Sequence, residues 1–217
     1  MWLPGHLAVA FLACTPLLLY SRRKGEDATL ALVYVAFFAV FPDFLHIGDL
    51  RIVSHSLVGL AALVSIALVV LSLLSEVRRS LVVIASVAAG AHLFADYLYG
   101  HFFPLFPFST EYVSLNAFNT FMDIRVEIGL FAIATVVFAI YMFSGRTGLR
   151  YVRPVRRERW GYLILLLPFL AMTLLESAYF IQNMMIVGTT ITRLILLSTF
   201  AVLLVGTLIL IRDLLER

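Results

Sequence analysis

A short polar stretch, FPDFLHIGDLRIVSHS at residues 41–56, lies between two long apolar runs. It contains Asp43, His46, Asp49 and His55. Imidazole nitrogens and carboxylate oxygens are ligands that proteins offer to Zn²⁺ and related ions. The stretch is therefore a candidate metal site, although an Asp or a His at a membrane surface is more often simply solvated.

Further potential ligands occur outside this stretch. His92 and Asp96 are four residues apart in AHLFAD, so on a helix they lie on one face, one turn apart. His6 follows a Pro-Gly pair near the N-terminus. Taken alone, the His92 and Asp96 spacing is explained equally well by a hydrogen-bonded pair between helices.

Asp123 and Glu127 repeat the four-residue spacing in FMDIRVE. A carboxylate inside an apolar span is costly to bury, so a partner for Glu127 is expected. That partner could be a metal ion, or it could be Arg125 or Arg193.

The elements that must carry these residues are membrane helices. Of the 217 residues, 62% are hydrophobic and 13% are charged, about half the charged fraction of soluble domains. Apolar runs that approach or reach the length of a span fall at residues 3–20, 28–42, 55–75, 80–100, 121–143, 161–187 and 190–211. The sequence predicts an all-α fold: a polytopic transmembrane helical bundle of about seven spans, with residues 1–217 as a single integral membrane domain.

The distribution of Lys and Arg predicts the orientation of this bundle. With the N-terminus outside and seven alternating spans, 13 of the 16 Lys and Arg fall on the inner side. Basic residues favour the cytoplasmic side, so we expect the N-terminus outside and the C-terminus inside a plasma or inner membrane. Because the basic residues sit in short loops, the net charge of +3 does not indicate nucleic acid, and the lipid bilayer is the expected partner.

The same orientation places the candidate ligands together. All five histidines (His6, His46, His55, His92 and His101) fall on the outer side, as do the carboxylates of Asp43, Asp49, Asp96, Glu111, Asp123 and Glu127. The orientation was derived from Lys and Arg alone, so this convergence is an independent observation. It predicts one shared metal site at the outer face.

Five motifs, in chain order GHLAVAF, FPDFLH, RIVSHS, AHLFADYLYG and PLFPF, resemble the membrane-bound metal-dependent hydrolase family, described as LexA-binding inner-membrane-associated hydrolases. The resemblance covers roughly residues 4–127 and leaves the additional spans within residues 161–211 without a motif. It implies metal-site roles for His6, Asp43, His55, His92 and Asp96, with His46 nearby.

The chain departs from the family pattern at two positions. Leu45 stands where the pattern has an Asp, and Leu50 stands where it has a His, while Arg51 is retained. Asp49 could substitute for one of the two, and the number of metal ions stays open.

The pattern is also similar, more distantly, to the zinc-dependent phospholipase C and P1 nuclease group of helical phosphoesterases. In that comparison His92 and Asp96 correspond to one ligand pair, and Asp123 and Glu127 to a variant of a second.

The resulting prediction is an integral membrane metal-dependent hydrolase, with Zn²⁺ as the favoured ion and a phosphoester or lipid-like substrate at the outer face. Asp49 or Glu111 would act as general base or accept the other N–H of a ligating histidine, and Arg51 would contact a phosphate oxygen. Two alternatives remain open. One is a metal- or proton-coupled transporter that uses Glu176 near the middle of a span; the other is a family member that keeps the fold without catalysis.

Overall fold

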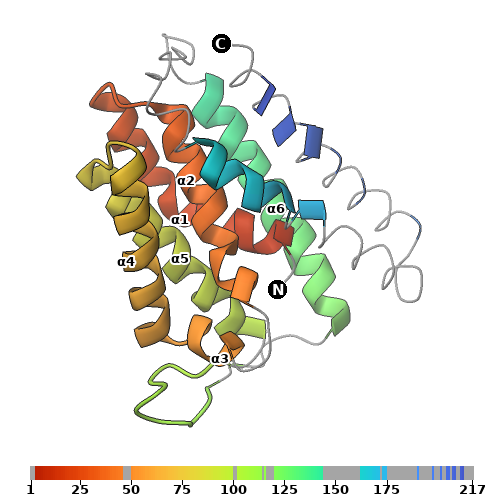
Figure 1. Ribbon diagram of the computed structural model, residues 1–217. Helices are drawn as coiled ribbons and strands as arrows, with labels where there is room; N and C mark the ends of the chain where they lie inside the picture. The colour runs from red at the N-terminus through yellow and green to blue at the C-terminus, as the bar shows by residue number, and fades with distance from the viewer. Residues whose placement is uncertain are drawn as a thin grey trace.

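The computed structural model describes residues 3–45, 50–99, 102–113, 115, 120–143, 162–171 and 173–174, and positions 190, 197, 201, 204–205, 207–208 and 211–212. At 99, 120–125, 128 and 142–143 it describes the backbone only. The elements are α1 (Leu3–Arg23), α2 (Ala28–Val40), η1 (Phe41–Leu45, a 3₁₀ helix), α3 (Leu50–Ser54), α4 (Leu57–Leu74), α5 (Arg79–Tyr99) and α6 (Thr120–Phe143) (Figure 1). A further helix covers Tyr162–Ala171. Within these residues there is no strand, only an isolated bridge between Phe102 and Val113, which agrees with the all-α prediction.

Four of the described helices are long and apolar enough to cross a membrane: Leu3–Arg23, Ala28–Leu45, Leu57–Leu74 and Arg79–Leu98. Shorter apolar helical segments cover Gly129–Tyr141 and Tyr162–Ala171. Most residues of the two spans expected at 161–187 and 190–211 lie outside the described residues. The membrane character of the chain is supported, while the number seven and the orientation stay predictions.

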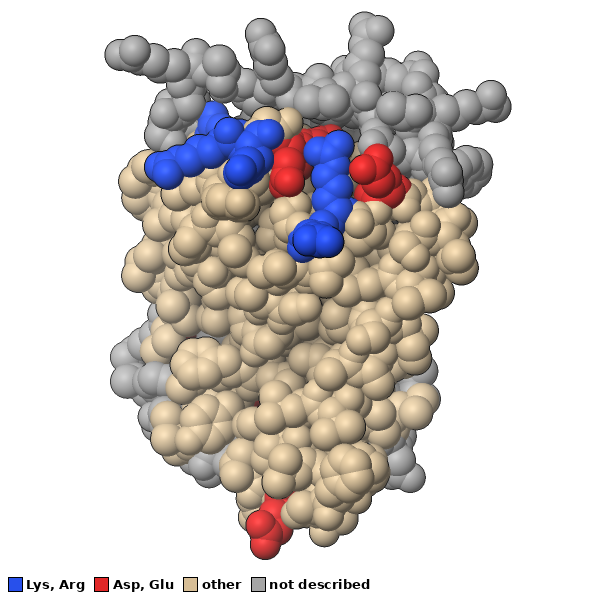
Figure 2. All heavy atoms as spheres, turned by 90° about the vertical axis from the view of Figure 1, so that its left-hand side faces the viewer, with Lys and Arg blue, Asp and Glu red and all other residues tan. Residues whose placement is uncertain are grey.

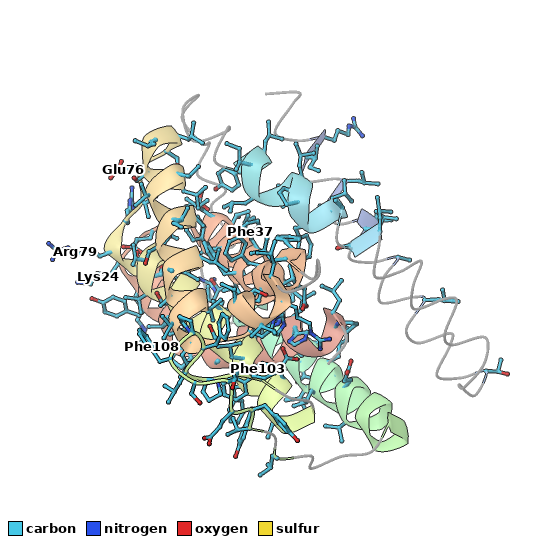
Figure 3. All side chains as sticks on the ribbon, turned by 60° about the horizontal axis from the view of Figure 1, so that its bottom comes forward. Lys24, Phe37, Glu76, Arg79, Phe103 and Phe108 are labelled. Carbon is cyan, nitrogen blue, oxygen red and sulfur yellow. The ribbon has the colours of Figure 1, made fainter. Side chains whose placement is uncertain are left out.

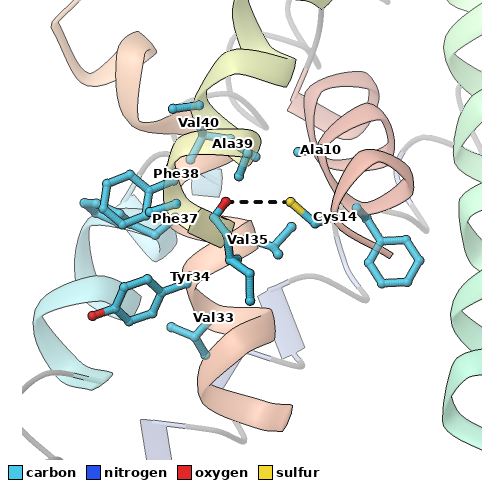
Figure 4. Close-up of a cluster of buried hydrophobic side chains, with 14 of the residues drawn as sticks. Ala10, Cys14, Val33, Tyr34, Val35, Phe37, Phe38, Ala39 and Val40 are labelled. Carbon is cyan, nitrogen blue, oxygen red and sulfur yellow. Dashed lines mark hydrogen bonds between the residues drawn. The ribbon is translucent and has the colours of Figure 1, made fainter. Parts of the chain in front are cut away.

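α1 is the centre of the bundle and packs against α2, α5 and α6, while α5 also packs against α2. Small side chains permit this close approach: Ala85, Ala88 and Ala89 of α5 are buried. Figure 4 shows the adjoining apolar cluster of α1 and α2, in which the Cys14 thiol donates to the carbonyl of Ile84 at 3.7 Å. These contacts fix the axial positions of the helices that carry the candidate ligands.

α4 lies at the edge of the bundle, where it contacts α5 (Figure 1). Large apolar side chains on its outer side are exposed, among them Ile66, Val69 and Leu73. An exposed apolar helix face suits contact with lipid chains.

The corner before α4 differs from the sequence-based prediction. The segment VSHS at residues 53–56 predicts that Ser54 caps this span, with His55 in its first turn. Ser56 is the cap instead, accepting from the N–H of Gly59 at 2.9 Å, and Ser54 ends the separate helix α3. The two helices meet closely, because a Cβ on Gly59 would lie 2.0 Å from the carbonyl oxygen of Val53. His55 is thereby held between two helices.

Basic residues gather at one end of the molecule (Figure 2). They come from the end of α1 and the connection to α2, with Arg23 and Lys24, and from the connection after α4 and the start of α5, with Arg78 and Arg79. The first turn of α1, the end of α2 and the end of α5 all lie at the opposite end. That opposite end holds the candidate ligands.

Candidate metal centre

Five polar side chains from four segments converge at this end of the bundle. They are His6 of α1, Asp43 of η1, His55 between α3 and α4, and His92 and Asp96 of α5. Figure 3 turns this end forward, with Phe103 and Phe108 of the following loop on the near side and Glu76 and Arg79 farther away. The structure thus brings together the five residues that the family resemblance names.

Local structure explains how each segment delivers its residue. The four-residue spacing of His92 and Asp96 on α5 puts the Nε2 atom of His92 3.2 Å from Oδ2 of Asp96. After α2 the chain continues as the 3₁₀ helix η1, which contains Pro42 and Asp43. η1 contacts α5, and this contact places Asp43 beside α5. His6 lies in the first turns of α1, whose packing on α5 stacks the His6 ring on that of His92, with centroids 3.9 Å apart.

Three donor atoms form one tight face: His55 Nε2, His92 Nε2 and Asp96 Oδ2. The Nε2 atoms of the two histidines are 3.3 Å apart, and each lies 3.2 Å from Oδ2 of Asp96. Oδ1 of Asp43 completes the set at 3.4 Å from His55 and 3.5 Å from His92. A tetrahedral Zn²⁺ with ligands at about 2.0–2.1 Å holds them roughly 3.3–3.4 Å from one another. His55, His92 and Asp96 therefore fit zinc in both type and spacing, and Oδ1 of Asp43 is a further donor beside the two histidines.

The contacts of the Nδ1 atoms of His55 and His92 determine that Nε2 of each ring faces this set. Nδ1 of His92 lies 2.7 Å from the carbonyl oxygen of Ala39, and Nδ1 of His55 lies 3.0 Å from that of Arg51 and 2.9 Å from the hydroxyl of Ser54. A carbonyl oxygen only accepts, so both Nδ1 atoms carry the hydrogen. The Nε2 lone pairs then point at each other and at two carboxylates, an arrangement that needs a cation or a proton between them.

Burial of these side chains makes the need for a cation or a proton greater. The side chains of His6, His55 and His92 are at most 5% exposed, whereas those of Asp43 and Asp96 are each 14% exposed. Burial lowers the pKa of His55, but hydrogen bonds to Asp43 and Asp96 more than offset it and raise the pKa to about 9. The metal-free site therefore holds a proton where the metal-loaded site would hold an ion, and the carboxylates are its most accessible side.

His6 stands slightly apart from the tight set. Its Nε2 atom lies 3.5 Å from Oδ1 of Asp96 and 3.9 Å from Oδ2 of Asp43. Its Nδ1 atom is buried and has no hydrogen-bond partner among the described residues. The donor atoms of His6, Asp43 and His92 lie within 4.8 Å of one another, so this group could also hold an ion.

The loop after α5 fixes His55 through backbone hydrogen bonds that side-chain motifs do not reveal. The N–H of Phe103 donates to the carbonyl of His55 at 3.3 Å, and the N–H of Leu57 donates to that of Pro104 at 3.1 Å. The N–H of Leu115 donates to the carbonyl of Tyr97 at 3.0 Å, which ties the far end of the loop to α5. The sequence motif PLFPF thus marks a segment that supports the site from outside.

Other predicted residues have different outcomes. His46 and Asp49 lie outside the described residues, as does the side chain of Asp123. Glu127 is buried on α6 and belongs to neither of the close donor groups found among the described residues.

The side chains of Arg51 and Glu111 are exposed, on α3 and on the loop after α5. Leu50 is 49% exposed, so the position where the family pattern has a histidine lies on the outer side of α3. Glu176, on which the transporter alternative rests, lies outside the described residues.

No family model, curated protein or solved structure matches this chain.

Proposed function

We propose that the protein is an integral membrane metal-dependent hydrolase that acts on a phosphoester or lipid-like substrate at the outer membrane face. One observation carries this proposal: the donor atoms of His55, His92 and Asp96 lie 3.2–3.3 Å from one another, with Oδ1 of Asp43 at 3.4 and 3.5 Å from the two histidines. When bound in this donor cluster, which also includes His6, Zn²⁺ would supply Lewis acidity and would lower the pKa of a water at a ligand position that the protein leaves open.

The residues of the chain would hold and orient this centre. The carbonyls of Ala39 and Arg51 fix the rings of His92 and His55, so that both present Nε2 to the ion. The partly exposed carboxylates of Asp43 and Asp96 leave one side of the centre open to a substrate. Arg51, exposed one helical turn before His55, would contact a phosphate oxygen.

General-base catalysis is assigned to Asp49 or Glu111 in this proposal. Glu111 is exposed on the loop that is hydrogen-bonded to the main chain at His55 and Leu57. A carboxylate at that position can exchange protons with water and reach a substrate bound at the accessible side. Exchanging Glu111 for Gln would then lower turnover and leave the metal content unchanged.

The difference in charge between the two ends of the bundle supports the proposed position in the membrane. In a seven-span arrangement with the N-terminus outside, the basic end faces the cytoplasm and the metal centre lies level with the outer headgroups. Phe108, 83% exposed, and Tyr112, 61% exposed, lie in the loop at the metal end, where aromatic side chains suit the interface. A centre at that depth favours a lipid or lipid-linked phosphoester as substrate.

The proposal is tested first by metal content and then by hydrolysis. Detergent-purified wild type is compared by plasma mass spectrometry with His92→Ala and Asp96→Ala. Glu76→Gln is the matched control, because the Glu76 side chain is 74% exposed in the connection at the opposite end of α5. We expect bound zinc in wild type and control, and its loss in both site variants.

A panel of phosphoesters and esters then tests the reaction. Cleavage by zinc-loaded wild type that is absent in His92→Ala supports a hydrolase. A folded, zinc-loaded wild type that cleaves nothing in the panel would contradict it.

A further inference from the structure

We infer that the centre holds two metal ions of unequal affinity, which share the carboxylates of Asp43 and Asp96. This inference rests on the proposed function in one respect only: that the donor cluster binds a metal ion. The two positions are defined by which oxygen of each carboxylate faces which histidine.

Each carboxylate presents one oxygen to His55 and His92 and its other oxygen to His6. Asp96 presents Oδ2 to His55 and His92, each at 3.2 Å, and Oδ1 to His6 at 3.5 Å. Asp43 presents Oδ1 to His55 and His92, at 3.4 and 3.5 Å, and Oδ2 to His6 at 3.9 Å. A carboxylate placed in this way can bridge two ions, one on each oxygen.

The first position has four protein donors. His55 Nε2, His92 Nε2, Asp43 Oδ1 and Asp96 Oδ2 supply four donors, the full number for tetrahedral zinc. His92 belongs to this position, because its Nε2 lies 3.3 Å from Nε2 of His55. Protein donors that fill every ligand position are typical of structural zinc.

Among the described residues, the second position has three protein donors. His6 Nε2, Asp96 Oδ1 and Asp43 Oδ2 offer three ligands and leave a coordination position for water or substrate. Three protein ligands with one open position are typical of catalytic zinc. The geometry therefore assigns the reacting ion to the His6 side.

The second position should bind its ion with lower affinity, because of the net charge of the site and because of the hydrogen bonding of the His6 ring. A first divalent ion already neutralises the two carboxylates, so a second would leave excess positive charge in a largely buried site. In addition, Nδ1 of His6 has no hydrogen-bond partner within the described part of the chain, whereas His55 and His92 each have a carbonyl. A ring without that support binds metal less tightly.

The test counts zinc in the full-length, detergent-purified protein after dialysis against zinc buffered by a graded series of chelators. Wild type should bind two equivalents, one of which is released at a lower chelator strength. His6→Ala should keep only the tightly bound equivalent. His55→Ala should lose that tight equivalent, and Glu76→Gln should behave as wild type.

Two results would overturn the inference. One is a wild type that saturates at one equivalent of zinc, with His6→Ala binding the same amount. The other is a His6→Ala protein that loses all zinc although it is still monodisperse and its circular dichroism spectrum is unchanged. If His6→Ala does not fold, His6→Gln, which keeps a polar side chain of similar size, takes its place.

The outcomes separate this inference from the proposed function. Two equivalents without hydrolysis of any ester support the two positions and contradict the hydrolase. One equivalent with hydrolysis does the reverse. A folded wild type that binds no zinc contradicts both.

Discussion

The Nε2 atoms of His55 and His92 lie 3.3 Å apart, and the Nδ1 atom of each ring faces a backbone carbonyl. Two acceptor nitrogens at that distance repel each other unless a cation or a proton lies between them. The carbonyls of Ala39 in α2 and Arg51 in α3 fix the hydrogen on Nδ1 of each ring. They thereby leave two Nε2 lone pairs in the site, which attract positive charge.

Zinc binding should release a proton from His55. Because the two carboxylates raise the pKa of His55 to about 9, the metal-free protein holds this proton at neutral pH. Zinc must displace the proton, so affinity should rise about tenfold per pH unit below about 9 and level off above it. Calorimetry in buffers of different ionisation enthalpy measures the release directly. An affinity independent of pH from about 6 to 8 would contradict this assignment.

Phosphate should strengthen retention of the more weakly bound zinc. The second ion adds charge that the two carboxylates cannot neutralise, and an anion on its open position would compensate. Inorganic phosphate in the dialysis buffer should therefore raise the chelator strength needed to remove the second equivalent from wild type. His6→Ala should show no such shift, and a shift of equal size in His6→Ala would contradict the assignment.

Gly59→Ala should destabilise the corner that holds His55. A Cβ at this position would lie 2.0 Å from the backbone oxygen of Val53, and a backbone atom cannot rotate away as a side chain can. We expect a loss of about 1–3 kcal/mol in unfolding free energy and weaker zinc retention. Gly90→Ala on α5 is the matched control, since a Cβ there meets nothing within 4 Å. It should be neutral or stabilising, because Ala favours a helix by about 1 kcal/mol over Gly. Equal melting temperatures for the two variants would contradict the close contact.

Asp27 links the start of α2 to a later helix. One carboxylate oxygen accepts from the N–H groups of Thr29 and Leu30, at 2.8 and 3.1 Å, and the other accepts from the Tyr162 hydroxyl. Asp27→Ala should cost about 1 kcal/mol for the cap and up to about 1.5 kcal/mol for the second bond. Tyr162→Phe should lose only the second contribution. Thermal unfolding monitored by circular dichroism tests the order, and a larger loss in Tyr162→Phe than in Asp27→Ala would contradict it.

The sequence predicted which side chains converge better than it predicted the backbone groups that support them. His92 and Asp96 could be placed because a four-residue spacing has one meaning on a helix, and His6, Asp43 and His55 because the motif order resembles a known family. The carbonyls of Ala39 and Arg51 could not be found, since every residue has a carbonyl and only tertiary packing selects which one faces a ring. The cap at Ser54 was wrong for a related reason. Ser56, two residues farther along, is the cap, and the close contact between Gly59 and Val53 depends on tertiary packing that the local sequence does not reveal.

The proposed orientation can be tested because Cys14 is the only cysteine in the chain and is buried. In a Cys14→Ser background, Glu111→Cys introduces an exposed thiol in the loop at the metal end, and Glu76→Cys introduces one in the α4–α5 connection at the basic end. The segment Arg79–Leu98 between these two positions is long and apolar enough to cross a membrane, so a membrane-impermeant maleimide added to intact cells should label only one of them.

Basic residues favour the cytoplasm, so we expect labelling at position 111 in intact cells and at position 76 only after permeabilisation. Labelling of both positions in intact cells would contradict the span assigned to α5. Labelling of position 76 alone would leave the span intact but place the metal centre on the cytoplasmic side, where the substrate would be a headgroup of the inner leaflet.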